Sequence, residues 1–165
     1  MCLVREVEPD DWAILRDIRL AALQDAPQAF GSTYLREARF TEAQWRKRIN
    51  DRAVTFFAHL DEDPAPAGIA GVWVGDGAAD LVSMWVRPDA RGRGVGAALV
   101  MAAAGWAKAR DHDTLFLWVT ELNASARRLY EHYGFTPTVE RQPLPSDPAL
   151  TEIPDAPAAL ARRTV

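Results

Sequence analysis

The chain has almost no cysteine and little histidine. Cys2 is the single cysteine among 165 residues, which excludes an internal disulfide and fits a reducing compartment. The three histidines, His59, His112 and His132, are scattered along the chain, whereas zinc sites draw on cysteines and histidines at short spacings. The sequence therefore predicts neither a disulfide framework nor a metal site.

Long apolar runs and an excess of positive charge are also lacking. The longest apolar run, Gly94 to Ala107, is shorter than the roughly 20 residues that a membrane-spanning helix needs. The segment from Met1 to Trp12 carries acidic residues and lacks the apolar core of a signal peptide. The formal net charge is -4, so no chain-wide basic field is available to hold nucleic acid. We therefore expect a cytoplasmic protein that binds neither membranes nor nucleic acid.

What the chain does contain is a regular succession of strand-like and helix-like segments, most simply a single domain over residues 1–165. Apolar patterns predict strands at 3–7, 54–60, 67–74, 80–86, 114–119, 138–142 and 160–165. Helical spacing and capping signals predict helices at 9–25, 41–50, 95–110 and 123–133. Together they indicate an α/β fold, with a mixed, mostly antiparallel central sheet of about six or seven strands flanked by about four helices.

Three local expectations follow from these segments. In the first helix, the apolar positions leave Arg16, Asp17 and Arg19 facing outward. The polar and aromatic segment from Gln28 to Arg39 is expected to be a loop. The proline-rich segment 137–157 is expected to form an irregular loop that joins the last two strands.

The most informative stretch runs from Val86 to Leu99, where a strand passes through a proline turn and a Gly/Arg loop into an apolar helix. Glycines allow the backbone to approach a ligand closely, and the N–H groups of a helix's first turn have no partner within the helix. The helix dipole and the nearby Arg87, Arg91 and Arg93 favour a phosphate or pyrophosphate there. We interpret the loop as the anchor for a phosphorylated cofactor.

Two familiar phosphate motifs fit this loop less well. A P-loop requires Gly-Lys-Ser/Thr after the glycines, and the chain lacks it. The dinucleotide fingerprint Gly-x-Gly-x-x-Gly/Ala is matched by Gly92, Gly94 and Ala97. That fold, however, places the fingerprint after the first strand of a parallel unit, whereas three meander-like strands precede it here. A dinucleotide site is therefore the weaker alternative.

A third motif fits better. The stretch from Arg91 to Gly96 resembles the Gln/Arg-x-x-Gly-x-Gly/Ala motif of the GNAT (GCN5-related N-acetyltransferase) superfamily, which binds the pyrophosphate of acetyl-CoA. Residues 85–90 resemble that family's approach from its fourth strand, and residues 115–119 and 123–135 resemble its fifth strand and the helix that follows. The resemblance implies a GNAT-type fold and an acetyl-CoA-dependent N-acetyltransferase. Such an enzyme moves the acetyl group directly to a primary amine, with no metal and no covalent enzyme intermediate.

The resemblance also implies a set of cofactor-binding residues. They are Trp85, Val86, Arg91, Gly92, Arg93, Gly94, Val95, Gly96, Ala97, Asn123, Ala126 and Tyr130. The backbone at Trp85 and Val86 would pair with the pantetheine arm as an added strand does, and a nearby N–H would face the thioester oxygen. Arg87 and Arg93 would be additional charge partners. Asn123 is in any case an expected helix N-cap.

By the same resemblance, Tyr130 is the general acid for the departing thiolate, although a packed aromatic would also explain it. A model tyrosine has a pKa of about 10 and a model thiol a pKa of about 8.5, so proton transfer from the phenol to the thiolate is uphill by roughly 2 kcal/mol. Ribosomal-protein-type members carry a glutamate five residues before the helix asparagine, where this chain has Trp118. The base is therefore left open. The candidates are Glu121, the first choice, then Asp80, Ser83 and His132.

The acceptor is a small-molecule amine or a protein or peptide amine, between which the sequence does not decide. Phe30 and Tyr34 are expected to wall its pocket, and plain packing explains them equally well. Trp73, Trp85 and Trp118 in strand positions suggest a partly aromatic cleft. A homodimer is common among proteins that resemble this one, and the oligomeric state stays open. A catalytically silent acyl-CoA-binding or sensing domain on the same fold is the second hypothesis.

Overall fold

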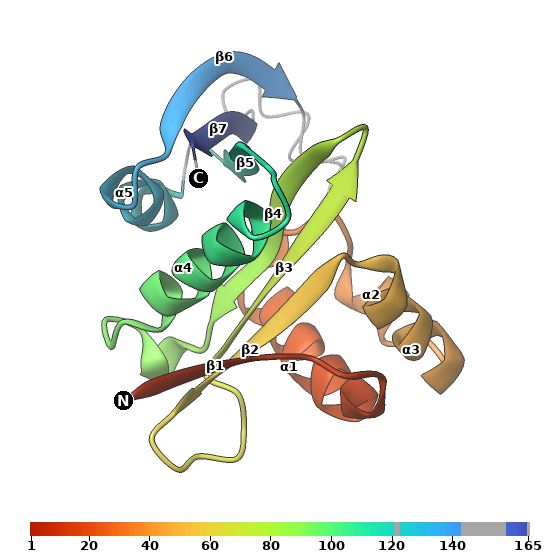
Figure 1. Ribbon diagram of the computed structural model, residues 1–165. Helices are drawn as coiled ribbons and strands as arrows, with labels where there is room; N and C mark the ends of the chain where they lie inside the picture. Colours follow the sequence, from red (N-terminus) through yellow and green to blue (C-terminus); the bar gives the residue numbers. More distant parts are fainter. Residues whose placement is uncertain (121–122, 143–157, 165) are drawn as a thin grey trace.

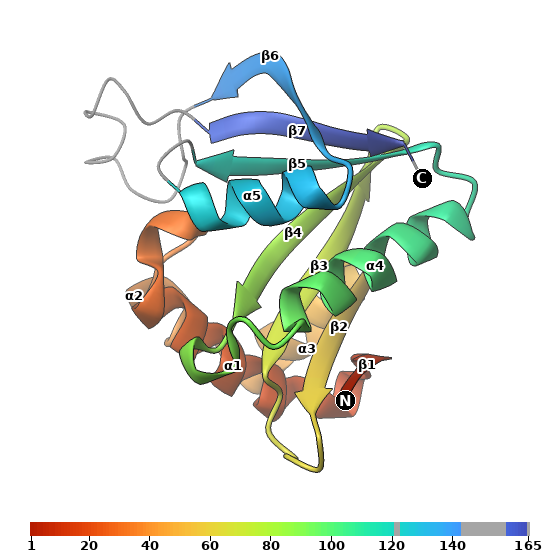
Figure 2. The ribbon, with the colours of Figure 1, turned by 90° about the vertical axis from the view of Figure 1, so that its left-hand side faces the viewer.

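The computed structural model describes residues 1–120, 123–142 and 158–164, and it arranges the strands in one sheet with helices on both faces (Figures 1 and 2). The strands are β1 (Cys2–Glu6), β2 (Val54–Leu60), β3 (Gly68–Gly75), β4 (Ala78–Val86), β5 (Thr114–Thr120), β6 (Thr136–Gln142) and β7 (Ala158–Thr164). The α-helices are α1 (Trp12–Asp25), α2 (Tyr34–Glu37), α3 (Glu42–Asp51), α4 (Val95–Lys108) and α5 (Ala124–His132). The four longer helices and the seven strands agree with the sequence-based prediction.

The strands follow the order β1-β2-β3-β4-β5-β7-β6 in a seven-stranded sheet. All neighbouring strands pair antiparallel except β4 and β5, which pair parallel. The prediction of a mixed, mostly antiparallel sheet with a meander before the Gly/Arg loop is therefore confirmed. None of the helices in the described part of the chain combines the length and apolar character of a membrane span.

Helices α4 and α5 lie on one face of the sheet, and α1 to α3 lie on the other (Figure 2). Helix α4 buries Val95 and Leu99 against β2, β3 and β4. A Cβ atom on Gly68 of β3 would come within 2.8 Å of Val95 Cγ1, so close packing of α4 requires a glycine there. On the opposite face, Trp45 of α3 and Phe57 of β2 are fully buried. Two apolar layers thus hold the sheet between the two sets of helices.

Local capping signals set the ends of two helices as predicted. Thr41 Oγ1 accepts a hydrogen bond from the Gln44 amide at 3.3 Å, and the Thr41 amide donates to Gln44 Oε1 at 2.8 Å, which is the capping box that begins α3. Gly134, at φ +87°, follows the end of α5 in the left-handed conformation typical of helix termini. Residues 28–39, by contrast, are not all loop, because Thr33 caps the short helix α2.

A bulge and a divergence in the middle of the sheet create an opening. Between the pairs Ile69–Trp85 and Gly71–Val82, strand β4 contains one residue more than β3, and Ser83 adopts φ +58° there. Strand β4 pairs with β5 only at residues 79–81. Beyond Leu81 the two strands separate, and β5 continues its pairing with β7 instead (Figure 2). The second half of β4 therefore has one edge without a partner strand in the described part of the chain.

Candidate acetyl-CoA and amine site

The opening between β4 and β5 is the mouth of a cleft of about 1280 Å³. Its walls are the second half of β4, the last residues of β5, the beginning of α4 and one face of α5. On the other side they are the segment after α1 and side chains of α1, α2 and α3. The Gly/Arg loop and the helix after β5, which are far apart in the sequence, meet at this cleft. The two blocks singled out in the sequence thus belong to one site.

The beginning of α4 presents unpaired amides to the cleft. Gly92 and Gly94 adopt φ +74° and φ +83°, a left-handed conformation that glycine adopts without strain. Among the described residues, the amides from Gly94 to Ala97 have no acceptor in hydrogen-bonding geometry. A Cβ on Gly96 would lie 3.0 Å from Leu129 Cδ2, so this glycine also lets α5 approach α4. Free amides at a helix N-terminus make a binding site for an anion.

Asp25, at the end of α1, ties the end of β4 to the Gly/Arg loop. Its Oδ2 atom accepts a hydrogen bond from Trp85 Nε1 at 2.9 Å and forms an ion pair with Arg91. The hydrogen bond from Trp85 and the contact with Arg91 hold the pKa of Asp25 below its usual value, although burial alone would raise it. Arg91 Nε also donates to the Val86 carbonyl at 3.1 Å. The side chains of Trp85 and Arg91 are thereby fixed beside the cleft.

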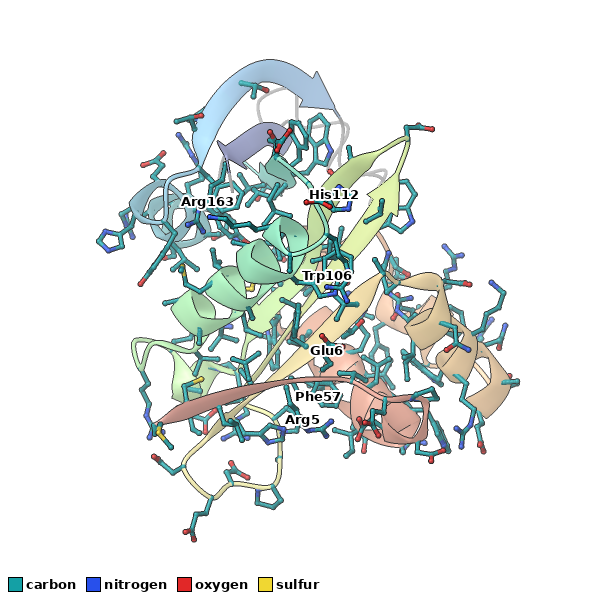
Figure 3. All side chains as sticks on the ribbon, in the orientation of Figure 1. Arg5, Glu6, Phe57, Trp106, His112 and Arg163 are labelled. Carbon is teal, nitrogen blue, oxygen red and sulfur yellow. The ribbon has the colours of Figure 1, made fainter. Side chains whose placement is uncertain are left out.

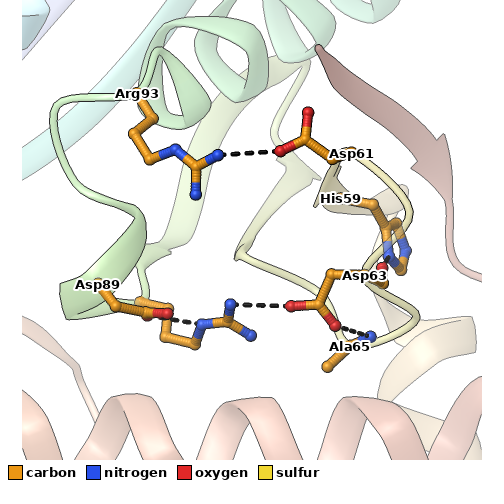
Figure 4. A network of polar contacts seen from close by, with 7 residues as sticks. His59, Asp61, Asp63, Ala65, Asp89 and Arg93 are labelled. Atoms are coloured by element: carbon orange, nitrogen blue, oxygen red, sulfur yellow. Dashed lines mark hydrogen bonds and ion pairs between the residues drawn. The ribbon is translucent and has the colours of Figure 1, made fainter.

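The other two arginines of the loop point elsewhere. Arg87 lies between Asp63, at 2.9 Å, and Asp89, at 2.7 Å, and Arg93 pairs with Asp61 at 2.9 Å (Figure 4). Neither Arg87 nor Arg93 is among the residues that line the cleft. Their described role is to attach the Gly/Arg loop to the turn between β2 and β3. The loop is thus held in place by ion pairs on the side away from the cleft.

Helix α5 presents Asn123, Ala126 and Tyr130 to the cleft. Asn123 Oδ1 accepts a hydrogen bond from the Ala126 amide at 3.2 Å, which confirms it as the N-cap. Tyr130 is 7% exposed and packs edge-to-face against Phe135, with ring centroids 5.6 Å apart. Burial raises the pKa of Tyr130 well above its usual value. Its phenol is therefore protonated across the pH range in which proteins are normally studied, and it is a weaker acid than a solvent-exposed tyrosine.

The candidate bases occupy different places. Asp80 is half-buried and lines the cleft, and burial raises its pKa. The Ser83 hydroxyl also lines the cleft, where it accepts a hydrogen bond from Arg19 at 3.2 Å. His132 is exposed, packs against Tyr133 and does not line the cleft. Glu121, the first choice from the sequence, lies outside the described residues.

Of the aromatic residues that the sequence assigned to the cleft, some line it and others do not. Phe30 is 4% exposed and lines the cleft, whereas Tyr34 is half-buried against the core of α1 and α3 and does not line it. Trp85 and Trp118 line the cleft, but Trp73 is exposed and lies away from it. The aromatic wall is thus smaller than the sequence suggests.

Two histidines are engaged elsewhere. His112 stacks on Trp106, which is at the C-terminal end of α4, with ring centroids 6.2 Å apart (Figure 3). His59 Nδ1 lies 3.3 Å from the Asp63 carbonyl oxygen in the turn after β2. Within the described part of the chain, no three side chains of histidine, cysteine, aspartate or glutamate come together as metal ligands.

Sequence reasoning missed a buried ion pair at the α1 side of the cleft, and the expected outward position of Arg19 is wrong. Arg19 is 4% exposed, and it donates two hydrogen bonds, at 2.9 and 3.0 Å, to the fully buried Glu37 of α2. Residue 19 follows Leu15 by four positions and precedes Leu23 by four, so it shares their buried face. That spacing was the available signal.

Comparisons with known proteins point to one family. Residues 15–135 match the family model described as "Acetyltransferase (GNAT) family". A mycothiol acetyltransferase from Beutenbergia cavernae is 41% identical over 90 residues, which are 53% of this chain and 30% of that protein. The chain thus matches about a third of the length of this relative.

Solved structures share the fold at low sequence identity. An acetyltransferase of the GNAT family from Streptococcus pneumoniae has a TM-score of 0.80 and 22% identity, over 100% of this chain and 99% of that chain. The PaiA N-acetyltransferase from Thermoplasma acidophilum, solved in complex with coenzyme A, has a TM-score of 0.72 and 13% identity, over 100% and 99%. With a family model that covers most of its length, the chain belongs to the acetyltransferase (GNAT) family.

Proposed function

We propose that this chain is an acetyl-CoA-dependent N-acetyltransferase that moves an acetyl group directly to a primary amine. One observation carries the proposal: unpaired amides, an open strand edge and a buried neutral phenol all face the same cleft. The amides from Gly94 to Ala97 suit a diphosphate. The open edge of β4 suits an extended arm that pairs with backbone groups. A GNAT structure that contains coenzyme A has the same fold, which further supports this fit.

Each group then has a chemical role. Bound acetyl-CoA supplies an activated acetyl thioester. Amides at the start of α4 and the Arg91 side chain hold the diphosphate, and Asn123 and Ala126 face the arm from α5. Tyr130 holds a proton at its Oη atom, available for the departing thiolate. Asp80 is the carboxylate on the cleft that we assign to take the proton from the incoming ammonium, directly or through water.

Replacing Asp80 with asparagine is expected to lower kcat/KM for an amine about tenfold at neutral pH, because water must then remove the proton. Burial raises the pKa of Asp80, so in the wild type its protonation adds to the loss of activity as the pH falls. The variant should lack that contribution in a pH profile of kcat/KM, while the ionisation of the amine remains in both profiles. Asp76→Asn, in the exposed turn before β4, is the control. Unchanged activity in Asp80→Asn would leave the base to another residue.

Replacing Gly94 with alanine is expected to weaken CoA binding at least about tenfold, because the added methyl group sits beside the free amides. The φ of +83° also costs a non-glycine residue about 1–2 kcal/mol of stability. Gly77→Ala is a matched control, since Gly77 has φ +79° and both positions have no atom within 4 Å of an added Cβ. The two variants should unfold at similar urea concentrations, and only Gly94→Ala should lose CoA affinity by calorimetry.

The activity itself is tested by thiol release from acetyl-CoA over a panel of amines, together with a thermal-shift titration with CoA. Amine-dependent thiol release supports the proposal. CoA binding without thiol release on any amine would indicate an acyl-CoA-binding domain instead. A thermal shift with NADH but not with CoA would favour the dinucleotide alternative.

A further inference from the structure

The wall of the cleft that is formed by α1, α2 and α3 is strongly basic. Arg19, Arg36, Arg48 and Arg52 all line it. Glu37 is the carboxylate in contact with this arginine cluster, and it is completely buried. Of the four guanidinium groups, those of Arg19 and Arg48 contact this carboxylate, in a protein whose formal net charge is -4. The concentration of positive charge is local and faces the cleft.

Glu37 is already fully occupied. Arg19 binds both of its carboxylate oxygens, and Arg48 Nη1 lies 3.2 Å from Oε1. Burial lowers the pKa of Arg48 to about 10, and the charges of Arg19, Arg52 and Arg36 act in the same direction. The negative charge of Glu37 opposes this shift. The Arg48 guanidinium thus experiences the other three charges of the cluster. Because Glu37 already contacts Arg19 and Arg48, it has no free oxygen with which to neutralise Arg36 or Arg52.

Among the described residues, Arg52 and Arg36 form no ion pair. No carboxylate of the described residues lies within ion-pair distance of either side chain. Arg52 is also half-buried, and burial and the charge of Arg19 lower its pKa, although the charges of Glu37 and Asp51 act in the opposite direction. The arginines at the other end of the cleft differ, because Arg87, Arg91 and Arg93 each have an aspartate partner. A half-buried cation without a partner is costly unless something binds there.

The arginine cluster does not belong to the diphosphate site. It lies on the α1–α3 side of the sheet, whereas the free amides lie at the beginning of α4, on the opposite face. Ser83, at the bulge of β4, joins the two regions through its hydrogen bond to Arg19. The cluster therefore belongs to the part of the cleft that remains for the acceptor. Guanidinium groups bind carboxylates and phosphates through paired N–H donors.

We propose that the acceptor is a small amine that also carries a carboxylate or phosphate, and that Arg52 and Arg36, with Arg48, bind this anionic group. The inference rests on the proposed N-acetyltransferase function and specifies its substrate class. Arg19 and Glu37 hold the cluster in position, and Arg52 supplies the unpaired charge. The amine of the substrate is left free to face Asp80 and the acetyl donor.

The test compares amines that differ in the anionic group alone. Thiol release is measured with 4-aminobutyrate against butylamine, and with O-phosphoethanolamine against ethanolamine. We expect kcat/KM for at least one anionic member to exceed that of its neutral partner at least about tenfold. The pair with the larger ratio distinguishes carboxylate from phosphate. Arg52→Gln should raise the KM for the preferred anionic amine about tenfold, with kcat nearly unchanged, and leave the neutral amine unaffected.

Two further variants and one binding measurement complete the test. Arg52→Lys should restore part of the affinity, and Arg39→Gln, an exposed arginine outside the cleft lining, should behave as the wild type. Calorimetry of both anionic amines with the CoA-loaded protein reports binding without turnover. Equal use of both members of each pair, or an Arg52→Gln variant with unchanged KM, overturns this inference and leaves the enzymatic function intact. If no amine releases thiol, the proposed function fails. Calorimetry then tests the anion site separately: binding of an anionic amine that Arg52→Gln abolishes supports this site, and binding that the variant keeps contradicts it.

Discussion

Tyr130→Phe is expected to lower kcat at least about 100-fold while the KM for acetyl-CoA changes little, because a general acid contributes about 10²–10⁴ to the rate. The ring that packs against Phe135 is kept, and the proton that the hydroxyl holds is lost. Burial raises the pKa of Tyr130, so this proton is present throughout the working pH range. The thiol-release assay at saturating acetyl-CoA measures the effect.

Tyr34→Phe is the matched control, since this tyrosine is half-buried but does not line the cleft. It should retain wild-type kcat, and both variants should unfold within about 1 kcal/mol of the wild type. No described residue forms a hydrogen bond with the Tyr130 hydroxyl, so its removal leaves no buried partner unsatisfied. A Tyr130→Phe enzyme as fast as the wild type would remove Tyr130 from the mechanism.

Glu37→Gln is expected to lower the free energy of unfolding by about 3–5 kcal/mol, because it leaves the buried Arg19 charge without a counter-ion. Urea unfolding followed by tryptophan fluorescence measures the loss. Burial alone would raise the pKa of Glu37, but the hydrogen bonds and charge of Arg19, together with Arg48 and Ser32, outweigh it, and the pKa is lowered. The stabilisation is therefore present above the unfolded-state pKa of about 4.3 and is lost as the pH falls through the folded-state value.

The comparison variant is Glu42→Gln, whose carboxylate pairs with Arg46 four residues later on the exposed surface of α3. Such a pair contributes about 0.5 kcal/mol or less. The stability difference between the two variants should shrink as the pH falls toward the acid range, since protonated Glu37 resembles glutamine. A Glu37→Gln protein as stable as Glu42→Gln would show that the buried pair contributes no net stability.

The features predicted well from the sequence depend on residues close together in the chain. The capping box at Thr41, the N-cap Asn123 and the glycines of the loop each act within about four residues, and each lies where its pattern places it. The strands β2 and β3 followed the sequence for a similar reason, since each is a continuous apolar run bounded by turn residues. Short-range physical chemistry therefore identifies the end of the cleft that is formed by the Gly/Arg loop and the start of α4.

The features that were missed depend on partners distant in the chain. A charged residue on an amphipathic helix is usually solvated, and Arg19 is buried only because Glu37 lies 18 positions away in a helix too short to show a period. Arg87 and Arg93 pair with aspartates 24 and 32 positions away. The bulged strand β4 contains neither glycine nor proline, so its own sequence does not indicate the bulge at Ser83. The end of the cleft beside α1, α2 and α3 was consequently predicted only in part, through Phe30.

The separation of β4 from β5 places an open backbone edge inside a sheet rather than at its rim. An open rim is the feature through which sheets recruit further strands and aggregate. Here an invading polypeptide would have to fit between two strands that are each anchored to another neighbour, β4 to β3 and β5 to β7. The arrangement thus leaves the backbone groups of β4 accessible to a narrow, extended ligand while hindering edge-to-edge association with another chain.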